Sequence, residues 1–288
     1  MTEISFYKKY SRKRYRFELL GQHFLKNKNK LKRISKSLNL KNNDTVIEIG
    51  PGHGELTDEV IEQFSNSAIK NYKLILIEKD SGLAKSLQDK YSSEKRIEII
   101  NDDALKVIPR LINRLTDQLI NYKIVGNIPY YITGYLLRIL GELGNKPKLI
   151  VLMIQKEVAK RITEKPPKMN LLAASIQFWA KPEILFYVGK KEFKPAPKVD
   201  SAVISLKPYP ITQLPNYQLL INNYYRFIKI FFKQPRKTIY NNLKSQISNF
   251  KNKEEFIKKL KILDINIQNR PQNLNIEQII ALSQAIEI

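Results

Sequence analysis

The segment Glu48–Gly54, Glu-Ile-Gly-Pro-Gly-His-Gly, is the feature that most restricts how this chain can fold. It overlaps the end of a short β-branched run at 45–50 and is followed by a helical pattern at 55–65. Glycines in such a loop allow positive φ and let a ligand approach the main chain closely. A strand, a glycine loop and a helix in this order are typical of sites for nucleotide-like cofactors, although a purely structural glycine turn is the alternative.

Strand and helix patterns alternate along the next hundred residues, about 25 residues apart. Because parallel strands need crossover helices, this alternation predicts a doubly wound parallel sheet. Two later strands are separated by a proline-bearing segment, so we expect them to form an antiparallel edge. The expected strands are 45–50, 73–78, 96–100, 123–127, 148–154, 183–188 and 201–208, and the expected helices are 55–65, 81–91, 104–116 and 132–143.

The two ends of the chain differ from this central part. An N-terminal arm and a basic amphipathic helix at 25–40 occupy residues 1–41, and the α/β core is expected over 42–208. Prolines at 208, 210 and 215 indicate a boundary, beyond which the pattern is helical. We therefore expect a small all-helical domain over 209–288, with helices at 216–233, 236–249, 253–262 and 275–286.

The charge is large and unevenly distributed. The 288 residues carry 50 Lys and Arg against 27 Asp and Glu, a net charge of +23. Residues 1–41 contribute +11 and residues 208–288 contribute +7, whereas the middle contributes only +5. Such a surplus favours a polyanionic partner, nucleic acid before an anionic membrane surface, and the alternative is an ordinary solvated surface. The basic runs lack the apolar face that an interfacial helix needs, so we do not expect the protein to bind a membrane surface.

The absence of cysteine excludes a disulfide scaffold, a thiolate zinc site and a cysteine nucleophile. We expect no metal. The first residues lack the apolar stretch of a signal peptide, and no window resembles a membrane span, so a cytoplasmic location is expected.

Acidic residues favour S-adenosylmethionine over a dinucleotide in the glycine loop. The glycine spacing is G-x-G-x-G, preceded by Glu48. Glu78 closes the second strand, where a carboxylate can accept both ribose hydroxyls, and Asp103 follows the third strand, where it can accept from an adenine amine. Carboxylates suit a ligand that bears a sulfonium and an ammonium, whereas they would repel a pyrophosphate.

Asn127-Ile128-Pro129-Tyr130 ends the fourth strand, at the edge where open parallel sheets place their chemistry. The Asn127 carboxamide oxygen and the Ile128 carbonyl can each accept one N–H of an exocyclic base amine, which directs the amine at a methyl donor. Pro129 fixes the backbone, and Tyr130 offers a flat face to an unstacked base. The alternative is an Asn-Pro turn with a packing tyrosine.

Seven segments in a fixed order resemble the ribosomal RNA adenine dimethyltransferases. They are GQHFL (21–25), EIGPGHGELT (48–57), IEKD (77–80), NDDAL (101–105), VGNIPYYIT (125–133), QKEVAKRI (155–162) and FKPAPKVDSAV (193–203). The resemblance covers nearly the whole chain. It implies a Rossmann-like methyltransferase sheet and transfer of two methyl groups from S-adenosylmethionine to N6 of adenine.

The resemblance also implies roles for individual residues. His23 and Leu25 would border the cofactor, and Gly50, Glu78 and Asp103 would bind its methionine, ribose and adenine parts. Asn127 would touch the cofactor and orient the amine, together with Ile128, Pro129 and Tyr130. Phe193 would stack on the base opposite Tyr130.

The C-terminal segment favours one branch of this family. FFKQPRKTIYNNL (231–243) is similar to the Q-R-R-K-T-x-x-N-x-L signature of the small-subunit enzymes, in which Arg236 and Lys237 would contact RNA. The implied substrate is two adjacent adenines near the 3′ end of 16S rRNA in an immature small ribosomal subunit, bound by a monomer. Pro235, Tyr131 and the segment 169–177 depart from the family pattern.

Two alternatives remain open from the sequence. One is a large-subunit 23S rRNA methylase of the erythromycin-resistance type, which shares the chemistry. The other is a non-catalytic assembly or transcription factor that binds nucleic acid through the basic ends of the same fold.

Overall fold

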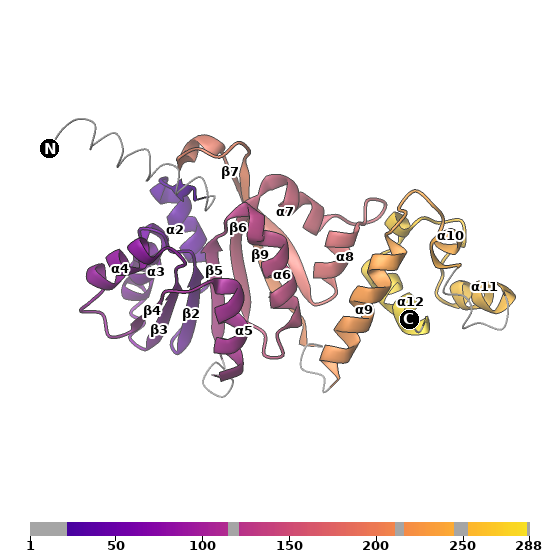
Figure 1. The fold of residues 1–288 in the computed structure, drawn as a ribbon, viewed down its shortest axis with the longest axis horizontal. Coiled ribbons are helices and arrows are strands. Elements are labelled where there is room, and N and C mark those ends of the chain that lie inside the picture. The colour runs from indigo at the N-terminus through magenta and orange to yellow at the C-terminus, as the bar shows by residue number, and fades with distance from the viewer. Residues whose placement is uncertain (1–21, 115–120, 211–215, 245–252, 287–288) are drawn as a thin grey trace. The chain divides into compact units, whose positions relative to one another are not determined.

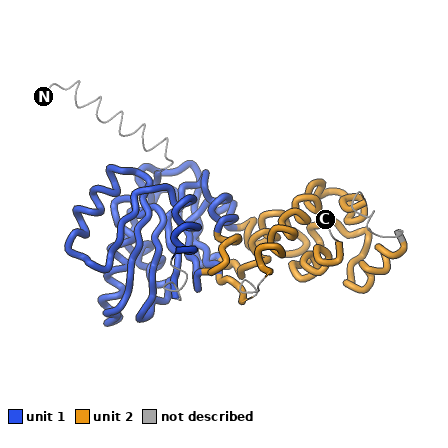
Figure 2. The backbone as a smooth tube through the Cα atoms, turned by 60° about the horizontal axis from the view of Figure 1, so that its bottom comes forward, with its two compact units in different colours: residues 1–139, 147–159, 184–206 blue, residues 140–146, 160–183, 207–288 orange. Residues whose placement is uncertain are grey.

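The computed structural model describes residues 22–114, 121–210, 216–244 and 253–286. The basic and aromatic arm expected at 1–18 lies outside these residues. The described chain divides into two compact units (Figure 2). Of the described residues, those within 1–139, 147–159 and 184–206 form the first unit, and those within 140–146, 160–183 and 207–288 form the second.

A seven-stranded mixed sheet organises the α/β part of the molecule, as the sequence predicts (Figure 1). The five strands from β4 to β6 pair in parallel, and β9 runs antiparallel to β6. Their interior residues form nearly continuous apolar runs because parallel strands are covered on both faces. The order is β4 (Ile97–Ile100), β3 (Tyr72–Ile77), β2 (Asp44–Ile49), β5 (Tyr122–Asn127), β6 (Leu149–Gln155), β9 (Ser201–Pro208) and β7 (Ala180–Val188).

The chain changes direction across the sheet between β2 and β5. From β2 it proceeds outward to β3 and β4, and then returns to place β5 on the other side of β2. Glu48 and Ile49 of β2 are in register with Val125 and Gly126 of β5. The loops that follow these two strands therefore leave the same edge of the sheet next to each other, where ligands bind in open α/β sheets.

Helices connect the strands of the sheet (Figure 1). Most show one buried apolar stripe, as in α5, where Val107, Ile108, Leu111 and Ile112 face inward. The helices are α2 (Lys28–Ser37), α3 (Glu55–Asn66), α4 (Ser81–Lys90), α5 (Ala104–Arg114), α6 (Thr133–Glu142) and α7 (Lys156–Thr163). The short helix α7 had no counterpart among the helices predicted from sequence.

A two-stranded antiparallel sheet joins segments that are far apart in the sequence. It pairs β1 (Phe24–Leu25) with β8 (Phe193–Lys194), and Leu25 lies opposite Phe193. Both of these side chains are buried in the hydrophobic core. The pairing brings the segment before α2 against the loop that follows the 3₁₀ turn Lys190–Glu192.

The second unit is helical. Aromatic side chains of α9 fill its core: Tyr224 stacks on Phe178 at 4.1 Å and donates its hydroxyl to the carbonyl of Ala174. The helices are α8 (Leu171–Gln177), α9 (Tyr217–Phe231), α10 (Ile239–Leu243), α11 (Lys253–Ile262) and α12 (Ile276–Ala285), with a 3₁₀ turn at Pro271–Asn273. The segment 169–177 forms α8, whose first turn is capped by Asn170.

Candidate active site

A pocket opens at the carboxyl edge of the sheet, where the loops after β2 and β5 meet. It is a concave site that is partly open to solvent. The lining residues come from five segments of the first unit: 22–24, the glycine loop, the end of β3, the segment after β4, and the loop after β5. They are Gln22, His23, Phe24, Ile49, Gly50, Gly52, Ile77, Glu78, Lys79, Asp103, Ala104 and Asn127–Ile132.

The glycine loop has the left-handed backbone that the sequence predicts. Gly50, Gly52 and Gly54 all have positive φ. At Gly52 a Cβ atom would also lie 2.7 Å from the Phe24 ring, so a larger residue there would displace β1. The loop therefore needs glycine both for its turn and for close packing against the N-terminal segment.

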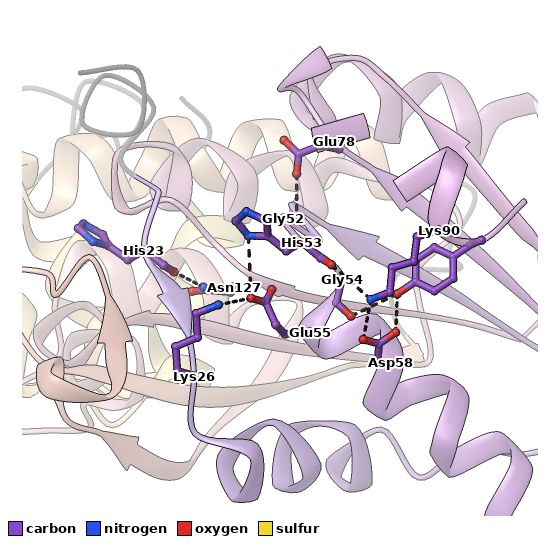
Figure 3. A network of polar contacts seen from close by, with 11 residues as sticks. His23, Lys26, Gly52, His53, Gly54, Glu55, Asp58, Glu78, Lys90 and Asn127 are labelled. Carbon is purple, nitrogen blue, oxygen red and sulfur yellow. Dashed lines mark hydrogen bonds and ion pairs between the residues drawn. The ribbon is translucent and has the colours of Figure 1, made fainter. Parts of the chain in front are cut away.

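Backbone groups hold the Glu78 carboxylate at the end of β3. One oxygen accepts from the N–H of Gly52 at 3.1 Å and the other from the N–H of Asp80 at 2.8 Å. The first of these bonds is drawn in Figure 3. Burial raises the pKa of Glu78. Because each oxygen keeps a second lone pair, the fixed carboxylate can still accept hydrogen bonds from a ligand.

Asp103 lies directly before α5 and is oriented by two donors. Its carboxylate accepts from the N–H of Leu105 at 3.0 Å and from the Lys79 ammonium at 2.8 Å. Partial burial alone would raise the pKa of Asp103, but these hydrogen bonds outweigh it and lower that pKa. The charged carboxylate and its lysine partner both line the pocket.

Asn127, at the end of β5, is tied to the N-terminal segment. Its side-chain amide donates to the carbonyl of His23 at 2.6 Å (Figure 3). The His23 ring in turn hydrogen-bonds through Nδ1 to the carbonyl of Pro195 at 2.9 Å. Since a carbonyl only accepts, the Asn127 nitrogen must face His23, and the carboxamide oxygen is left for another partner.

The loop after β5 is held on both sides. The Ile128 N–H donates to the carbonyl of Met153 at 3.1 Å, which continues the pairing with β6. The Tyr130 hydroxyl shares a 2.8 Å hydrogen bond with the buried hydroxyl of Ser201, the first residue of β9. Burial raises the pKa of Tyr130, so this side chain is neutral at physiological pH.

A second network, of ion pairs and hydrogen bonds, connects the glycine loop and the start of α3 to neighbouring segments (Figure 3). Lys26 pairs with Glu55 at the start of α3, at 2.5 Å. Lys90 pairs with Asp58 at 2.6 Å and also donates to the carbonyl of His53 at 3.4 Å. These contacts tie the segment before α2 and the end of α4 to the first turn of α3.

The structure brings most, but not all, of the predicted site residues together. His23, Gly50, Glu78, Asp103 and the loop 127–130 line one pocket. Leu25 and Phe193 do not line it, because both side chains are buried where β1 pairs with β8. Arg236 and Lys237 are exposed in the second unit, between α9 and α10.

Sequence reasoning used Glu48 only as an acid that precedes the glycine loop, and it assigned no role to Ser201. Glu48 is 1% exposed and accepts from the Thr57 hydroxyl at 2.8 Å, and burial raises its pKa to about 8. An acid two residues before the glycine loop is visible in the sequence, but its burial is not. Ser201 sits in a recognisable motif, although nothing local to it shows that its hydroxyl reaches Tyr130.

Comparison with known proteins decides the family. The family model described as ribosomal RNA adenine dimethylase matches residues 12–287. The chain belongs to this family. It is therefore an S-adenosylmethionine-dependent rRNA adenine dimethyltransferase, as the sequence motifs predict.

Relatives of this dimethylase cover nearly its whole length. A Mycoplasma capricolum protein named ribosomal RNA small subunit methyltransferase A is 35% identical over 93% of this chain and 96% of its own. A Fusobacterium nucleatum protein of the same name is 32% identical over 93% of this chain and 96% of its own.

Solved structures agree on the fold. A dimethyladenosine transferase from Plasmodium falciparum has a TM-score of 0.74 and 26% identity, covering 92% of this chain and 99% of that one. The 23S rRNA methyltransferase ErmE has a TM-score of 0.68 at 23% identity, covering 91% of this chain and 99% of its own, and this likeness concerns the fold alone.

The donor set of the pocket fits S-adenosylmethionine. Two carboxylates, Glu78 and Asp103, line the pocket. A sulfonium and an ammonium are favoured there by charge. Across the described residues, no group of three or more His, Asp or Glu side chains is placed to hold a metal ion. None of the described helices is long and apolar enough to cross a bilayer.

Proposed function

We propose that this dimethylase transfers methyl groups to N6 of two adjacent adenines near the 3′ end of 16S rRNA, in the immature small ribosomal subunit. The observation that carries the proposal is the full-length match to the family, together with an intact Asn127–Tyr130 loop beside an acidic cofactor pocket. The small-subunit branch is supported by relatives at 32–35% identity that carry this name.

In this proposal the loop after β5 directs the target amine. The Asn127 carboxamide oxygen and the Ile128 carbonyl each accept one N–H, so the lone pair of the nitrogen points toward the methyl donor. The bond from Asn127 to His23 and the bond from Ile128 to Met153 keep both acceptors in place. No strong base is required, because methylation itself acidifies the amine and its proton can pass to water.

Tyr130 would hold the unstacked base. Its ring is anchored by the hydroxyl bond to Ser201, and Pro129 sets the extended backbone before it. A stacking role for Phe193 on the opposite face stays a prediction. It would require the ring to leave its buried position next to Leu25.

The cofactor would be held by residues from four loops. We assign the ribose hydroxyls to Glu78, the adenine amine to Asp103, and the methionine part to the main chain at Gly50, with His23 and Leu25 forming the N-terminal border. When bound, S-adenosylmethionine supplies the electrophilic methyl group.

RNA would be held mainly by the basic ends of the chain. Arg236 and Lys237 are exposed cations in the second unit, and phosphate neutralisation dominates RNA affinity. We retain a basic arm and helix at 1–41, a methyltransferase core at 42–208 and an RNA-binding domain at 209–288 as functional divisions. We also propose that the protein is a monomer, that it acts in the cytoplasm and that it does not bind a membrane.

The decisive experiment maps methylated adenines in ribosomal RNA from cells with and without the gene. We expect N6,N6-dimethyladenine at two adjacent positions near the 3′ end of 16S rRNA, present only when the gene is intact. The modification appearing in 23S rRNA instead would assign the chain to the resistance type. Unchanged modification in both rRNAs would favour a non-catalytic assembly or transcription factor.

A further inference from the structure

Two exposed tyrosines lie directly beyond the target loop. Tyr131 is 61% exposed and lines the pocket, and Tyr135 is 63% exposed on the first turn of α6. Large aromatic side chains that are mostly exposed contribute little to the core, which here is supplied by Leu136, Leu137 and Leu140 on the buried face of α6. The fold itself therefore does not explain these two rings.

The two tyrosines share one face of a continuous helical segment. The 3₁₀ turn Tyr130–Ile132 runs directly into α6, and residues 131 and 135 are four positions apart, a spacing that places side chains on one face of a helix. Gly134 lies between them, and a Cβ atom there would meet nothing within 4 Å. Arg138 is exposed one turn further along the same face.

This face, which we call the tyrosine face (Tyr131, Gly134, Tyr135 and Arg138), has the composition of a surface that binds single strands. Aromatic rings stack on bases without regard to sequence, and a neighbouring guanidinium contributes charge or stacking. Gly134 leaves this part of the face open, because a Cβ atom there would meet nothing within 4 Å.

We propose that the tyrosine face is a stacking platform for the RNA nucleotides that adjoin the target adenine. This inference rests on the proposed function, because it needs an RNA strand in the pocket. The face adjoins the pocket through Tyr131, which lines it, so a strand that approaches along this side would meet the two rings. The exposed Arg138 guanidinium gives this face a positive charge, which favours an anionic RNA strand over an apolar or basic protein partner.

The platform would also stabilise a substrate that has two adjacent target adenines. While one adenine occupies the pocket, the adjacent base has lost a stacking neighbour. A tyrosine ring at the rim would replace that neighbour and offset part of the cost of extruding the target. Tyr135, which does not line the pocket, is the cleaner test of this effect.

The test compares Tyr135→Ala, Tyr131→Ala and their double variant with the corresponding Phe variants. Methyl transfer from labelled S-adenosylmethionine is measured on small ribosomal subunits isolated from cells that lack the enzyme. We expect each Ala variant to raise KM for the subunits about fivefold or more, and each Phe variant to retain wild-type values. Tyr135→Ala should leave cofactor affinity, measured by calorimetry, within twofold of wild type.

A binding readout that needs no turnover separates this inference from the proposed function. A single-stranded RNA carrying 2-aminopurine next to an adenine is titrated with each protein, and stacking quenches the 2-aminopurine fluorescence. We expect quenching by the wild type and the Phe variants, and weaker quenching by both Ala variants. Tyr187→Ala, which removes a tyrosine 46% exposed on β7 in the same unit, serves as the matched control and should quench as the wild type does.

Three results would overturn the platform. Wild-type KM and quenching in the double Ala variant would show that the rings do not meet RNA. Equal losses in Phe and Ala variants would assign the effect to the hydroxyl groups. Reduced cofactor affinity in Tyr131→Ala, with no effect of Tyr135→Ala, would place Tyr131 in the cofactor site. Absence of dimethyladenine from 16S rRNA would instead overturn the proposed function, whatever the quenching shows.

Discussion

The side-chain amide of Asn127 donates a 2.6 Å hydrogen bond to the main-chain carbonyl of His23, which comes from a segment 104 residues earlier. This bond settles which end of the carboxamide is available for chemistry. The nitrogen is engaged by an acceptor, so the oxygen is the group that can meet an N–H of the target amine. It also makes the N-terminal segment part of the target site, and not only a border of the cofactor pocket.

Asn127→Ala should lower kcat for methyl transfer by roughly 10²-fold or more, because it removes an acceptor that orients the amine in the transition state. RNA affinity should stay within a few-fold of wild type, since no charge is lost. Asn127→Asp should also lose activity, because its carboxylate would place a second acceptor against the His23 carbonyl. Single-turnover kinetics and RNA filter binding test both variants, and wild-type turnover in Asn127→Ala would remove this residue from the mechanism.

The hydroxyl bond between Tyr130 and Ser201 predicts a coupled pair. Ser201→Ala should leave the Tyr130 hydroxyl without its partner and lower kcat/KM by roughly 3- to 10-fold, with little change in cofactor affinity. Tyr130→Phe should cost a similar amount, because the ring remains but its anchor is lost. If Ser201 acts through Tyr130, the double variant should be no worse than either single variant. Fully additive losses would show that Ser201 acts by another route.

Features that depend on consecutive residues could be predicted from the sequence, whereas features that depend on distant segments could not. The glycine loop and the Asn127–Tyr130 loop could be predicted, since a strand, a loop and a helix in succession place their residues at one sheet edge. The pairing of β1 with β8 could not, because two-residue strands carry no periodicity and their partners are separated by more than 160 residues. The short helices α7 and α8 were missed for the same lack of a full periodic pattern.

Phe193 shows why residue type does not fix exposure. An aromatic residue in a proline-rich loop is compatible with a stacking role, but β-pairing with Leu25 draws this ring into the core.

For Glu48, the sequence shows the position of the residue but not its burial. Its position before the glycines is visible in the sequence, whereas the burial that changes its pKa depends on β2 being covered on both faces.

Arg236 and Lys237 should act on RNA affinity and not on chemistry. Lys237→Ala should weaken RNA binding evenly across sequences and reduce the slope of log affinity against log salt by about 1, as expected for one lost phosphate contact. Arg236→Ala should behave in the same way, and cofactor affinity should not change in either variant. Lys85→Ala, at an exposed position on α4 in the methyltransferase core, is a matched control. A salt slope that no variant changes would contradict an RNA-binding role for this loop.

Glu48 should make the stability of the protein depend on pH. Burial raises its pKa from 4.5 to about 8, so between these values the folded protein holds a proton that the unfolded chain has released. The free energy of unfolding should therefore fall as pH rises from about 4.5 to 8, and this contribution should be constant below and above that window. Glu48→Gln removes the titrating group while its amide oxygen can still accept from Thr57.

The thermal midpoints of the two proteins give the test. The thermal midpoint of Glu48→Gln should match that of the wild type near pH 5 and exceed it by roughly 2 °C or more near pH 8.5. At the higher pH the wild type must either bury a charged carboxylate or keep a proton that the solution favours removing, whereas the glutamine has neither cost. S-adenosylmethionine, a cation bound next to this loop, favours the ionised acid. Cofactor binding near pH 7 should therefore release protons, measurable by calorimetry in buffers of different ionisation enthalpy, and Glu48→Gln should release fewer. A wild-type midpoint that rises between pH 5 and 8 by more than that of the variant would show that Glu48 is already ionised in the folded protein.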